Sequence, residues 1–226
     1  MAQLNELRIP VGEAVGDVSA ILVRPAGARL LYVLAHGAGA GMRHPFLERI
    51  SAALAERGVA TLRYQFSYME KRQRRPDPPV VATATVRAAV VAAADAAPGV
   101  PLFAGGKSFG GRMTSTAQSQ EPLPGVLGLA FLGFPLHPPG QAGVARAQHL
   151  DGVKIPMLFL QGDRDEFAEL ILLRQVVQRL GKRATLHVVK GGDHSFNVLK
   201  STGRSSEDVL AELCDTLVEW VGGVVG

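Results

Sequence analysis

Residues 106–110, with the sequence G-K-S-F-G, constrain the fold of this chain more than any other stretch. They follow an apolar run at 100–104 and lead into a helix-compatible segment that starts at residue 111. A strand that turns abruptly into a helix strains its corner residue, and a glycine two residues to either side leaves room for the bend. The pattern therefore predicts a nucleophile elbow. Ser108 would stand above the N-terminus of the next helix, where free N–H groups and the helix dipole stabilise negative charge on a substrate oxygen.

Two later loops supply partners for Ser108. Asp165 follows an apolar run at 156–160, and His194 follows a β-like run at 184–189. A serine hydroxyl becomes a nucleophile when an imidazole removes its proton, and a carboxylate on the other ring nitrogen holds the productive tautomer. We predict that Ser108 is the nucleophile, His194 the base and Asp165 the acid. Asp163 is the alternative acid. The usual loop after this strand places the acid three residues beyond a glycine, which from Gly162 selects Asp165.

A glycine-dense turn with the sequence H-G-A-G-A-G occupies residues 36–41, directly after a strand-like run at 30–35. Such a turn lets backbone amides approach a ligand closely. We predict that the amides of Ala38 and Phe109 form an oxyanion hole, and that Gly37 and Gly39 line the substrate site. His36 is expected to organise the turn through hydrogen bonds rather than to transfer a proton.

The sequence lacks two common phosphate-binding motifs, in each case because one required glycine is replaced. A Walker A loop would need glycine at the position of Pro101, and a dinucleotide-binding fingerprint would need glycine at that of Met42. The one cysteine and six histidines show no spacing typical of metal ligands. We therefore expect neither a metal nor a cofactor.

The motifs resemble those of the α/β-hydrolase superfamily, whose triads follow the order serine, acid, histidine. The resemblance runs from about residue 30 to residue 196 and is strongest with small lidless members similar to dienelactone hydrolase. The stretches G-G-K-S-F-G-G-R and H-G-A-G-A-G-M are more similar still to the group that includes testis-expressed protein 30. Dienelactone hydrolases carry cysteine at the elbow, whereas this chain has Ser108, which argues against dienelactone as the substrate.

The resemblance implies the fold and the triad of a serine hydrolase. From the predicted site we expect the protein to cleave an ester or thioester of a small soluble molecule through an acyl-enzyme. A second hypothesis is a binding protein or complex subunit that keeps the fold without turnover. Within enzymes, a peptidase or a deacetylase-type hydrolase is a further alternative.

The length of 226 residues and the 47% hydrophobic content suit one α/β domain over residues 1–226. Several of the later apolar runs lack alternation, which predicts a mostly parallel central sheet of about eight strands with helices on both faces. Only about two dozen residues separate the runs ending at 133 and starting at 156, so no cap domain is expected. We expect strands at 7–10, 18–23, 30–35, 60–65, 102–105, 126–133, 157–160 and 186–189, and helices at 45–57, 80–97, 109–118, 166–180 and 207–221.

Residues 63–75 contain five basic residues and one acidic residue, and they account for the whole formal net charge of +4. Loops that follow parallel strands emerge at one edge of a sheet, so this segment should lie on the side of Ser108. One hypothesis is that it attracts carboxylate- or phosphate-bearing substrates, with Arg72, Arg74 and Tyr64 in contact. The alternative is a solvated loop. We also expect His137 to lie at the rim of the substrate site.

Nucleic acid is not an expected partner, because one basic loop without a recognition fold is weak support. The first residues lack the basic and apolar segments of a signal peptide, and no apolar run approaches the ~20 residues of a membrane span. We therefore expect a cytoplasmic protein without a membrane partner. Cys214 falls on the apolar face of the last helix, so we expect it in the core.

Overall fold

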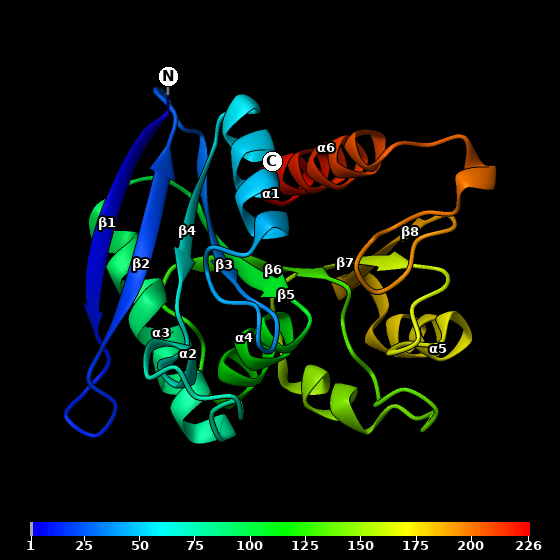
Figure 1. Ribbon diagram of the computed structural model, residues 1–226, viewed down its shortest axis with the longest axis horizontal. Helices are drawn as coiled ribbons and strands as arrows, with labels where there is room; N and C mark the ends of the chain where they lie inside the picture. The colour runs from blue at the N-terminus through cyan, green and yellow to red at the C-terminus, as the bar shows by residue number, and fades with distance from the viewer. Residues whose placement is uncertain (1) are drawn as a thin grey trace.

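The computed structural model describes residues 2–226, and an eight-stranded sheet runs through its centre (Figure 1). The strands lie in the spatial order β1-β2-β4-β3-β5-β6-β7-β8. Strand β2 is antiparallel to both of its neighbours, and the other pairs are parallel. The predicted mostly parallel sheet is confirmed. The bounds are β1 Gln3–Pro10, β2 Asp17–Arg24, β3 Leu30–Ala35, β4 Val59–Tyr64, β5 Leu102–Lys107, β6 Val126–Leu132, β7 Met157–Gly162 and β8 Ala184–Val189.

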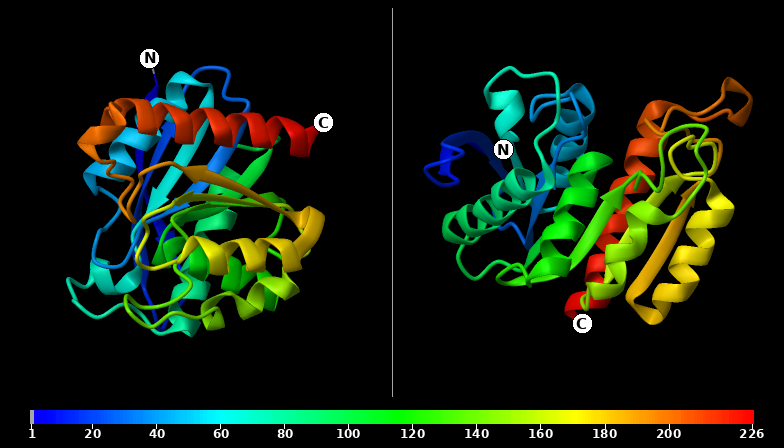
Figure 2. Two further views of the ribbon diagram at one scale, coloured as in Figure 1. Left: turned by 90° about the vertical axis from the view of Figure 1, so that its right-hand side faces the viewer. Right: turned by 90° about the horizontal axis from the view of Figure 1, so that it is seen from below.

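Helices cover both faces of the sheet, as the sequence predicts. Helices α1 and α6 pack against one face, and α3, α4 and α5 pack against the other; α6 and α5 lie on opposite sides of the sheet in Figure 2. The α-helices are α1 Pro45–Glu56, α2 Ser67–Glu70, α3 Pro79–Ala96, α4 Phe109–Gln120, α5 Leu170–Leu180 and α6 Ser206–Val225. Short 3₁₀ helices occupy η1 Ala145–Gly152, η2 Gly181–Arg183 and η3 Lys200–Thr202.

Strand β3 illustrates how the two-sided core forms. All six of its residues are buried. Leu31 and Val33 join the apolar layer beneath α3 and α4, whereas Tyr32 and Leu34 join the layer beneath α1 and α6. Because alternate side chains enter two separate apolar layers, the strand is apolar without alternation, as central parallel strands are. The same arrangement extends over the central strands.

Helix α6 begins and packs as its sequence indicates. Ser205 and Asp208 form a capping box, in which each side chain bonds the backbone N–H of the other residue. Cys214 is fully buried, as predicted, among the side chains between α6 and the sheet. The helix was expected to end at residue 221, but it continues to Val225 because Val221 and Val224 still reach the apolar layer.

One connection differs from the sequence-based expectation, and a second one agrees with it. Helix α5 starts at Leu170 instead of residue 166, because Asp165 Oδ1 accepts a hydrogen bond from the Phe167 amide at 2.8 Å and holds the preceding segment as a loop. The connection between Leu132 and Met157, every residue of which the structure describes, contains loops and the short helix η1. The expected absence of a cap domain therefore holds over this insertion point.

Helix α3 has the length and composition of a membrane-spanning helix, with 18 residues and a mean hydropathy of 1.4. This was not anticipated from the sequence. Seven of its residues are nevertheless buried against the sheet and its neighbouring helices. A core helix of an α/β protein passes the same test of length and hydropathy, so the helix is weak evidence for a membrane.

The loops that follow β3, β5, β7 and β8 meet at one edge of the sheet. They carry Ala38, Ser108, Asp165 and His194, respectively. Because parallel strands all end on the same side, residues that are far apart in the sequence converge there. The candidate site lies at this edge.

Candidate active site

Ser108 occupies the sharp turn between β5 and α4. Its backbone has φ 49° and ψ −116°, a conformation that a side chain disfavours. The glycines on either side are sterically required: a Cβ at Gly106 would lie 2.3 Å from the Ala35 carbonyl oxygen, and one at Gly110 would lie 2.5 Å from that of His36. The turn is fixed further by the Ser108 amide, which donates to the Leu132 carbonyl at 3.1 Å. The sheet therefore holds the serine in its strained position.

The three predicted catalytic residues form one hydrogen-bonded line. His194 Nε2 lies 2.8 Å from Ser108 Oγ, and His194 Nδ1 lies 2.7 Å from Asp165 Oδ2. A carboxylate only accepts, so Nδ1 carries the ring proton and Nε2 offers its lone pair to the serine hydroxyl. This is the tautomer that a general base needs. The alternative acid, Asp163, is exposed and accepts instead from the Gly191 amide at 2.7 Å.

Asp165 is held by more than the histidine. Its side chain is completely buried, and Oδ2 also accepts from Gln161 Nε2 at 2.5 Å. The Gln161 amide is oriented in turn, because its Oε1 accepts from the Phe134 amide at 2.8 Å. Together with the Phe167 amide on Oδ1, these donors hold both carboxylate oxygens in place. The aspartate side chain is therefore fixed in one orientation towards the imidazole.

Lys107 supports the histidine loop from the variable position of the elbow. Its Nζ donates to the His194 carbonyl at 2.6 Å and lies 5.6 Å from the centre of the Phe196 ring. Burial lowers the pKa of this lysine to about 8, while Asp165 and Asp193 oppose the shift. The ammonium points to this backbone carbonyl and forms no ion pair with a carboxylate of the described chain. Lys107 is thus still mostly protonated at neutral pH, and it fixes the position of His194.

The predicted oxyanion hole has two free donors. Within residues 2–226 neither the Ala38 amide nor the Phe109 amide has a hydrogen-bond acceptor. The glycine-rich turn is fixed by its neighbours instead: the Gly39 amide donates to Tyr68 Oη at 2.8 Å, and the Met42 amide donates to Gln65 at 2.8 Å. Donors held in place before a ligand arrives are the arrangement that stabilises a developing oxyanion.

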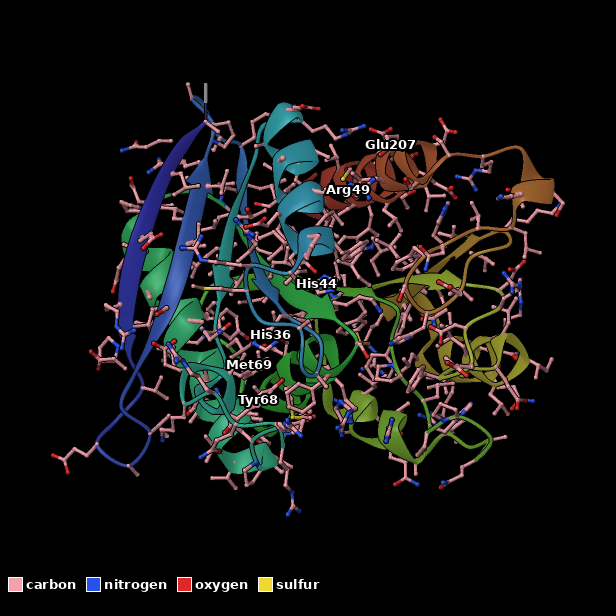
Figure 3. All side chains as sticks on the ribbon, in the orientation of Figure 1. His36, His44, Arg49, Tyr68, Met69 and Glu207 are labelled. Carbon is pink, nitrogen blue, oxygen red and sulfur yellow. The ribbon has the colours of Figure 1, made fainter. Side chains whose placement is uncertain are left out.

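His36 has the organising role that we expected. It is fully buried beside Tyr68 (Figure 3). The Phe66 amide donates to Nε2 at 3.1 Å, so Nδ1 must carry the ring proton and donate to the Gly37 carbonyl at 2.7 Å. Burial lowers the pKa of this imidazole from 6.5 to about 4, and the Gly37 carbonyl opposes the shift. The ring is therefore neutral at pH 7.

This neutral imidazole predicts a loss of stability in acid. Because the pKa of His36 is lower in the folded protein, the unfolded chain binds more protons below about pH 6.5, and folding weakens as the pH falls from 6.5 towards 4. At pH 4.5 the free energy of unfolding should drop by about 2 to 3 kcal/mol from this group. Urea unfolding at pH 7 and 4.5 should show that drop in wild type and a smaller one in His36→Asn. Equal drops in both proteins would contradict the prediction.

A cavity of about 280 Å³ adjoins Ser108 and His194. Gly37 and Ala38 line it, and so do Phe46 and Leu47 at the start of α1. His44, which caps α1 by accepting from the Phe46 amide at 3.3 Å, lines the cavity (Figure 3). We call it the apolar cavity, because Phe46, Leu47 and Phe167 are among the residues that line it.

Comparison with known proteins assigns the chain to a family. The profile described as alpha/beta hydrolase domain matches residues 28–222, which is most of the chain. The chain belongs to the alpha/beta hydrolase domain family. The predicted superfamily is thereby confirmed, and so is the α/β-hydrolase fold.

Solved structures of the alpha/beta hydrolase fold cover nearly all of this chain. Dienelactone hydrolase from Anabaena variabilis has a TM-score of 0.79 at 19% identity, with 99% of this chain and 98% of that chain covered. An α/β serine hydrolase without a lid from Xanthomonas campestris has a TM-score of 0.75 at 19% identity, covering 96% and 95%. Est1E from Butyrivibrio proteoclasticus has a TM-score of 0.70 at 18% identity, covering 96% and 99%. These similarities show a shared lidless fold.

Most of the predicted substrate-binding residues lie away from the cavity beside Ser108, whereas the three triad residues lie together. Gly37 lines the apolar cavity, but Gly39 lies beyond it. Tyr64 is completely buried in the layer beneath α3, because it is the last residue of a central strand and packs against Phe66. It therefore has no surface to offer a substrate. His137 is buried rather than exposed, and its Nε2 accepts from the Glu169 amide at 3.3 Å, so it organises the loop before α5.

The basic residues of segment 63–75 lie in two different environments, a buried strand and an exposed loop. Arg63 lies in β4, is only 3% exposed, and donates to the Met42 carbonyl at 3.0 Å, so it supports the glycine-rich turn from inside. Arg72 and Arg74 are exposed on the loop between α2 and α3, and neither lines the apolar cavity. Their predicted contact with substrate is not seen in this arrangement, because only later residues of the loop, Pro76 and Asp77, reach the side of Ser108.

Two residues of the site were not identified from the sequence. Gln161 orients Asp165, and the Phe167 ring lies 4.3 Å from the His194 ring, centre to centre. Gln161 is a polar residue near the end of an otherwise apolar strand and lies four residues before the acid. This position could have identified it from the sequence. Phe167 offered none, because its segment was assigned to a helix.

Proposed function

We propose that this protein is a serine hydrolase that cleaves an ester or thioester of a small molecule through an acyl-enzyme. The observation that carries the proposal is the hydrogen-bonded line from Ser108 through His194 to Asp165, beside two free backbone amides. The likeness to proteins described as esterases and serine hydrolases supports it. Est1E has also been solved with ferulic acid bound, which agrees with a small organic substrate.

The proposed reaction has two steps. Ser108 Oγ attacks the substrate carbonyl carbon while His194 Nε2 takes the hydroxyl proton, and the Ala38 and Phe109 amides stabilise the negative oxygen. His194 then gives the proton to the leaving oxygen or sulfur as its bond to the carbonyl carbon breaks. In the second step His194 takes a proton from water, whose oxygen attacks the acyl carbon, and returns that proton to Ser108 Oγ as the bond from Oγ to the acyl carbon breaks and the acid is released. This scheme uses no metal or cofactor.

The stretches around the elbow and the glycine-rich turn support a closer grouping with proteins such as testis-expressed protein 30. That grouping, a cytoplasmic location and a single domain over residues 1–226 are part of the proposal. The grouping carries no information about the substrate, so the chemistry rests on the site alone.

A fluorophosphonate probe tests the proposal, because it phosphonylates only a serine that is activated as a nucleophile. We expect stoichiometric labelling of the wild-type protein on Ser108, detected by intact mass and peptide mapping, and no labelling of Ser108→Ala. Ser195, which also lines the apolar cavity next to the histidine, provides the matched control: Ser195→Ala should label like wild type.

The outcome also separates the alternatives. A wild-type protein that resists the probe and turns over p-nitrophenyl hexanoate no faster than Ser108→Ala is a binding protein or complex subunit that keeps the fold. A protein that labels on Ser108 but cleaves acyl amides faster than esters is a peptidase or a deacetylase-type hydrolase. Either result would replace the ester proposal.

A further inference from the structure

A second cavity, of about 370 Å³, meets the apolar cavity at the nucleophile. Ala38, Ser108 and Phe167 line both cavities. The second one contains two guanidinium groups, those of Arg112 and Arg146, and we call it the arginine cavity. Because both cavities reach Ser108, a substrate bound at the serine would place its acyl group in one cavity and its leaving group in the other.

Arg112 is placed in this cavity by the elbow itself. It lies one turn into α4, where its amide donates to the Ser108 carbonyl at 3.1 Å. Its Nε is buried without a hydrogen-bond partner in the described chain, and its guanidinium lies 5.9 Å from the centre of the Phe109 ring. A buried donor that lacks an acceptor is costly, so this group is suited to a ligand that supplies one.

Arg146 approaches from the other side, on η1. Within residues 2–226 neither arginine side chain forms an ion pair or a hydrogen bond. Burial, and after it the charge of Arg146, lower the pKa of Arg112. Asp77 also lines the cavity, but its carboxylate accepts from the Tyr68 amide at 3.0 Å and pairs with neither arginine. Neither arginine in this half-buried space is thus paired with a carboxylate of the described chain, and a bound anion would stabilise both.

The position of the histidine decides which part of the substrate enters this cavity. His194 lines the apolar cavity and not the arginine cavity. The imidazole must reach the leaving oxygen in order to protonate it, so the leaving group lies on the side of the apolar cavity. The acyl group therefore points towards Arg112 and Arg146, past the apolar side chains of Met113 and Pro135.

We propose that the arginine cavity binds a carboxylate at the far end of the acyl group, so that the substrates are half-esters or half-thioesters of dicarboxylic acids. The inference rests on the proposed serine hydrolase function and specifies its substrate class. Guanidinium groups present forked donors that match the geometry of a carboxylate. The methylene chain between the two carboxyl groups would lie against Met113 and Pro135, and an uncharged leaving group would occupy the apolar cavity.

The reaction is balanced by water alone. Ser108 Oγ forms a bond to the ester carbonyl carbon, the bond from that carbon to the leaving oxygen breaks, and the serine proton passes through His194 to the leaving group. Water then hydrolyses the acyl-enzyme and releases the dicarboxylic acid. The distant carboxylate stays ionised throughout and takes no part in bond making.

Two matched esters test the proposal. p-Nitrophenyl hexanoate and the p-nitrophenyl half-ester of adipic acid have acyl groups of the same length and differ in a terminal methyl or carboxylate. Charge-assisted hydrogen bonds favour the carboxylate by about 10- to 100-fold in kcat/KM. We expect wild type to prefer the adipate half-ester by that factor, and Arg112→Gln and Arg146→Gln each to lose about 10-fold of the preference, measured as the ratio of the two kcat/KM values within each variant.

Two variants provide controls. Arg174→Gln removes an exposed arginine of α5 that lies outside both cavities, and it should keep the full preference. Arg72→Gln removes a charge from the exposed basic loop and should also keep it. A preference that falls in Arg72→Gln and persists in the cavity variants would assign anion recognition to the loop and overturn the proposal.

A third ester tests the orientation. The hexanoate ester of 4-hydroxybenzoic acid carries its carboxylate on the leaving group, where Lys107 lines the apolar cavity. We expect this ester to be a poorer substrate than the adipate half-ester, because the Lys107 ammonium is already held by the His194 carbonyl. A wild-type preference for this ester, or for the neutral hexanoate, would overturn the proposal while labelling of Ser108 leaves the hydrolase function intact. Failure of the labelling would overturn the function itself.

Discussion

Replacing Asp165 by asparagine is expected to lower kcat for ester hydrolysis about 10⁴-fold while leaving the fold intact. The substitution keeps the shape of the side chain but turns one oxygen into an NH₂ group. Oδ1 accepts from the Phe167 amide, so the oxygen of the new side chain stays there and the NH₂ group faces His194 and Gln161. The imidazole must then accept through Nδ1 and carry its proton on Nε2, where it cannot take the proton of Ser108.

The neighbouring Asp163 gives the matched control for this prediction. It lies two residues earlier, is exposed, and bonds the Gly191 amide instead of the imidazole. Asp163→Asn should therefore change kcat by less than about 3-fold, because a surface hydrogen bond distant from the ring contributes little. Steady-state rates with p-nitrophenyl hexanoate, and thermal unfolding to check the fold, would measure both variants. A larger loss in Asp163→Asn than in Asp165→Asn would exchange their roles.

The parts of the site that the sequence predicts are those that depend on local geometry. Ser108, Asp165 and His194 each follow a strand within a short motif, and parallel strands bring such positions to one edge of the sheet. The same reasoning locates the strands, because central parallel strands are continuously apolar. Fold and candidate triad therefore follow from motifs and strand positions without knowledge of the side-chain packing.

The lining of the two cavities could not be predicted in the same way. Tyr64 and Arg63 occupy the end of β4, and whether such a residue faces a ligand or the core depends on which helix covers it. Arg112 lies in the stretch G-G-R after the elbow, but its direction depends on η1, a segment without a clear periodic pattern. The sequence accordingly pointed to exposed arginines on a loop, whereas the structure places two others beside Ser108.

A methyl group at Gly106 should destabilise the protein more than the loss of any surface contact. The residue has φ +146°, and its Cβ would lie 2.3 Å from the carbonyl oxygen of Ala35 in the adjacent strand. Neither strand can move, because β3 and β5 lie at the centre of the sheet with helices on both faces. We expect Gly106→Ala to reduce the free energy of unfolding by about 3 to 6 kcal/mol, combining backbone strain with overpacking.

That cost is a large fraction of the ~5 to 15 kcal/mol by which domains are usually stable, so the variant should also accumulate poorly on expression. Urea unfolding measures the change. Gly223→Ala is the matched control: its Cβ would meet nothing within 4 Å, and it lies inside α6. Because alanine favours a helix over glycine by up to about 1 kcal/mol, this variant should be slightly more stable than wild type. If Gly106→Ala unfolded at the same urea concentration as Gly223→Ala, β3 and β5 would not be packed as closely as described, and the strained turn at Ser108 would lose its support.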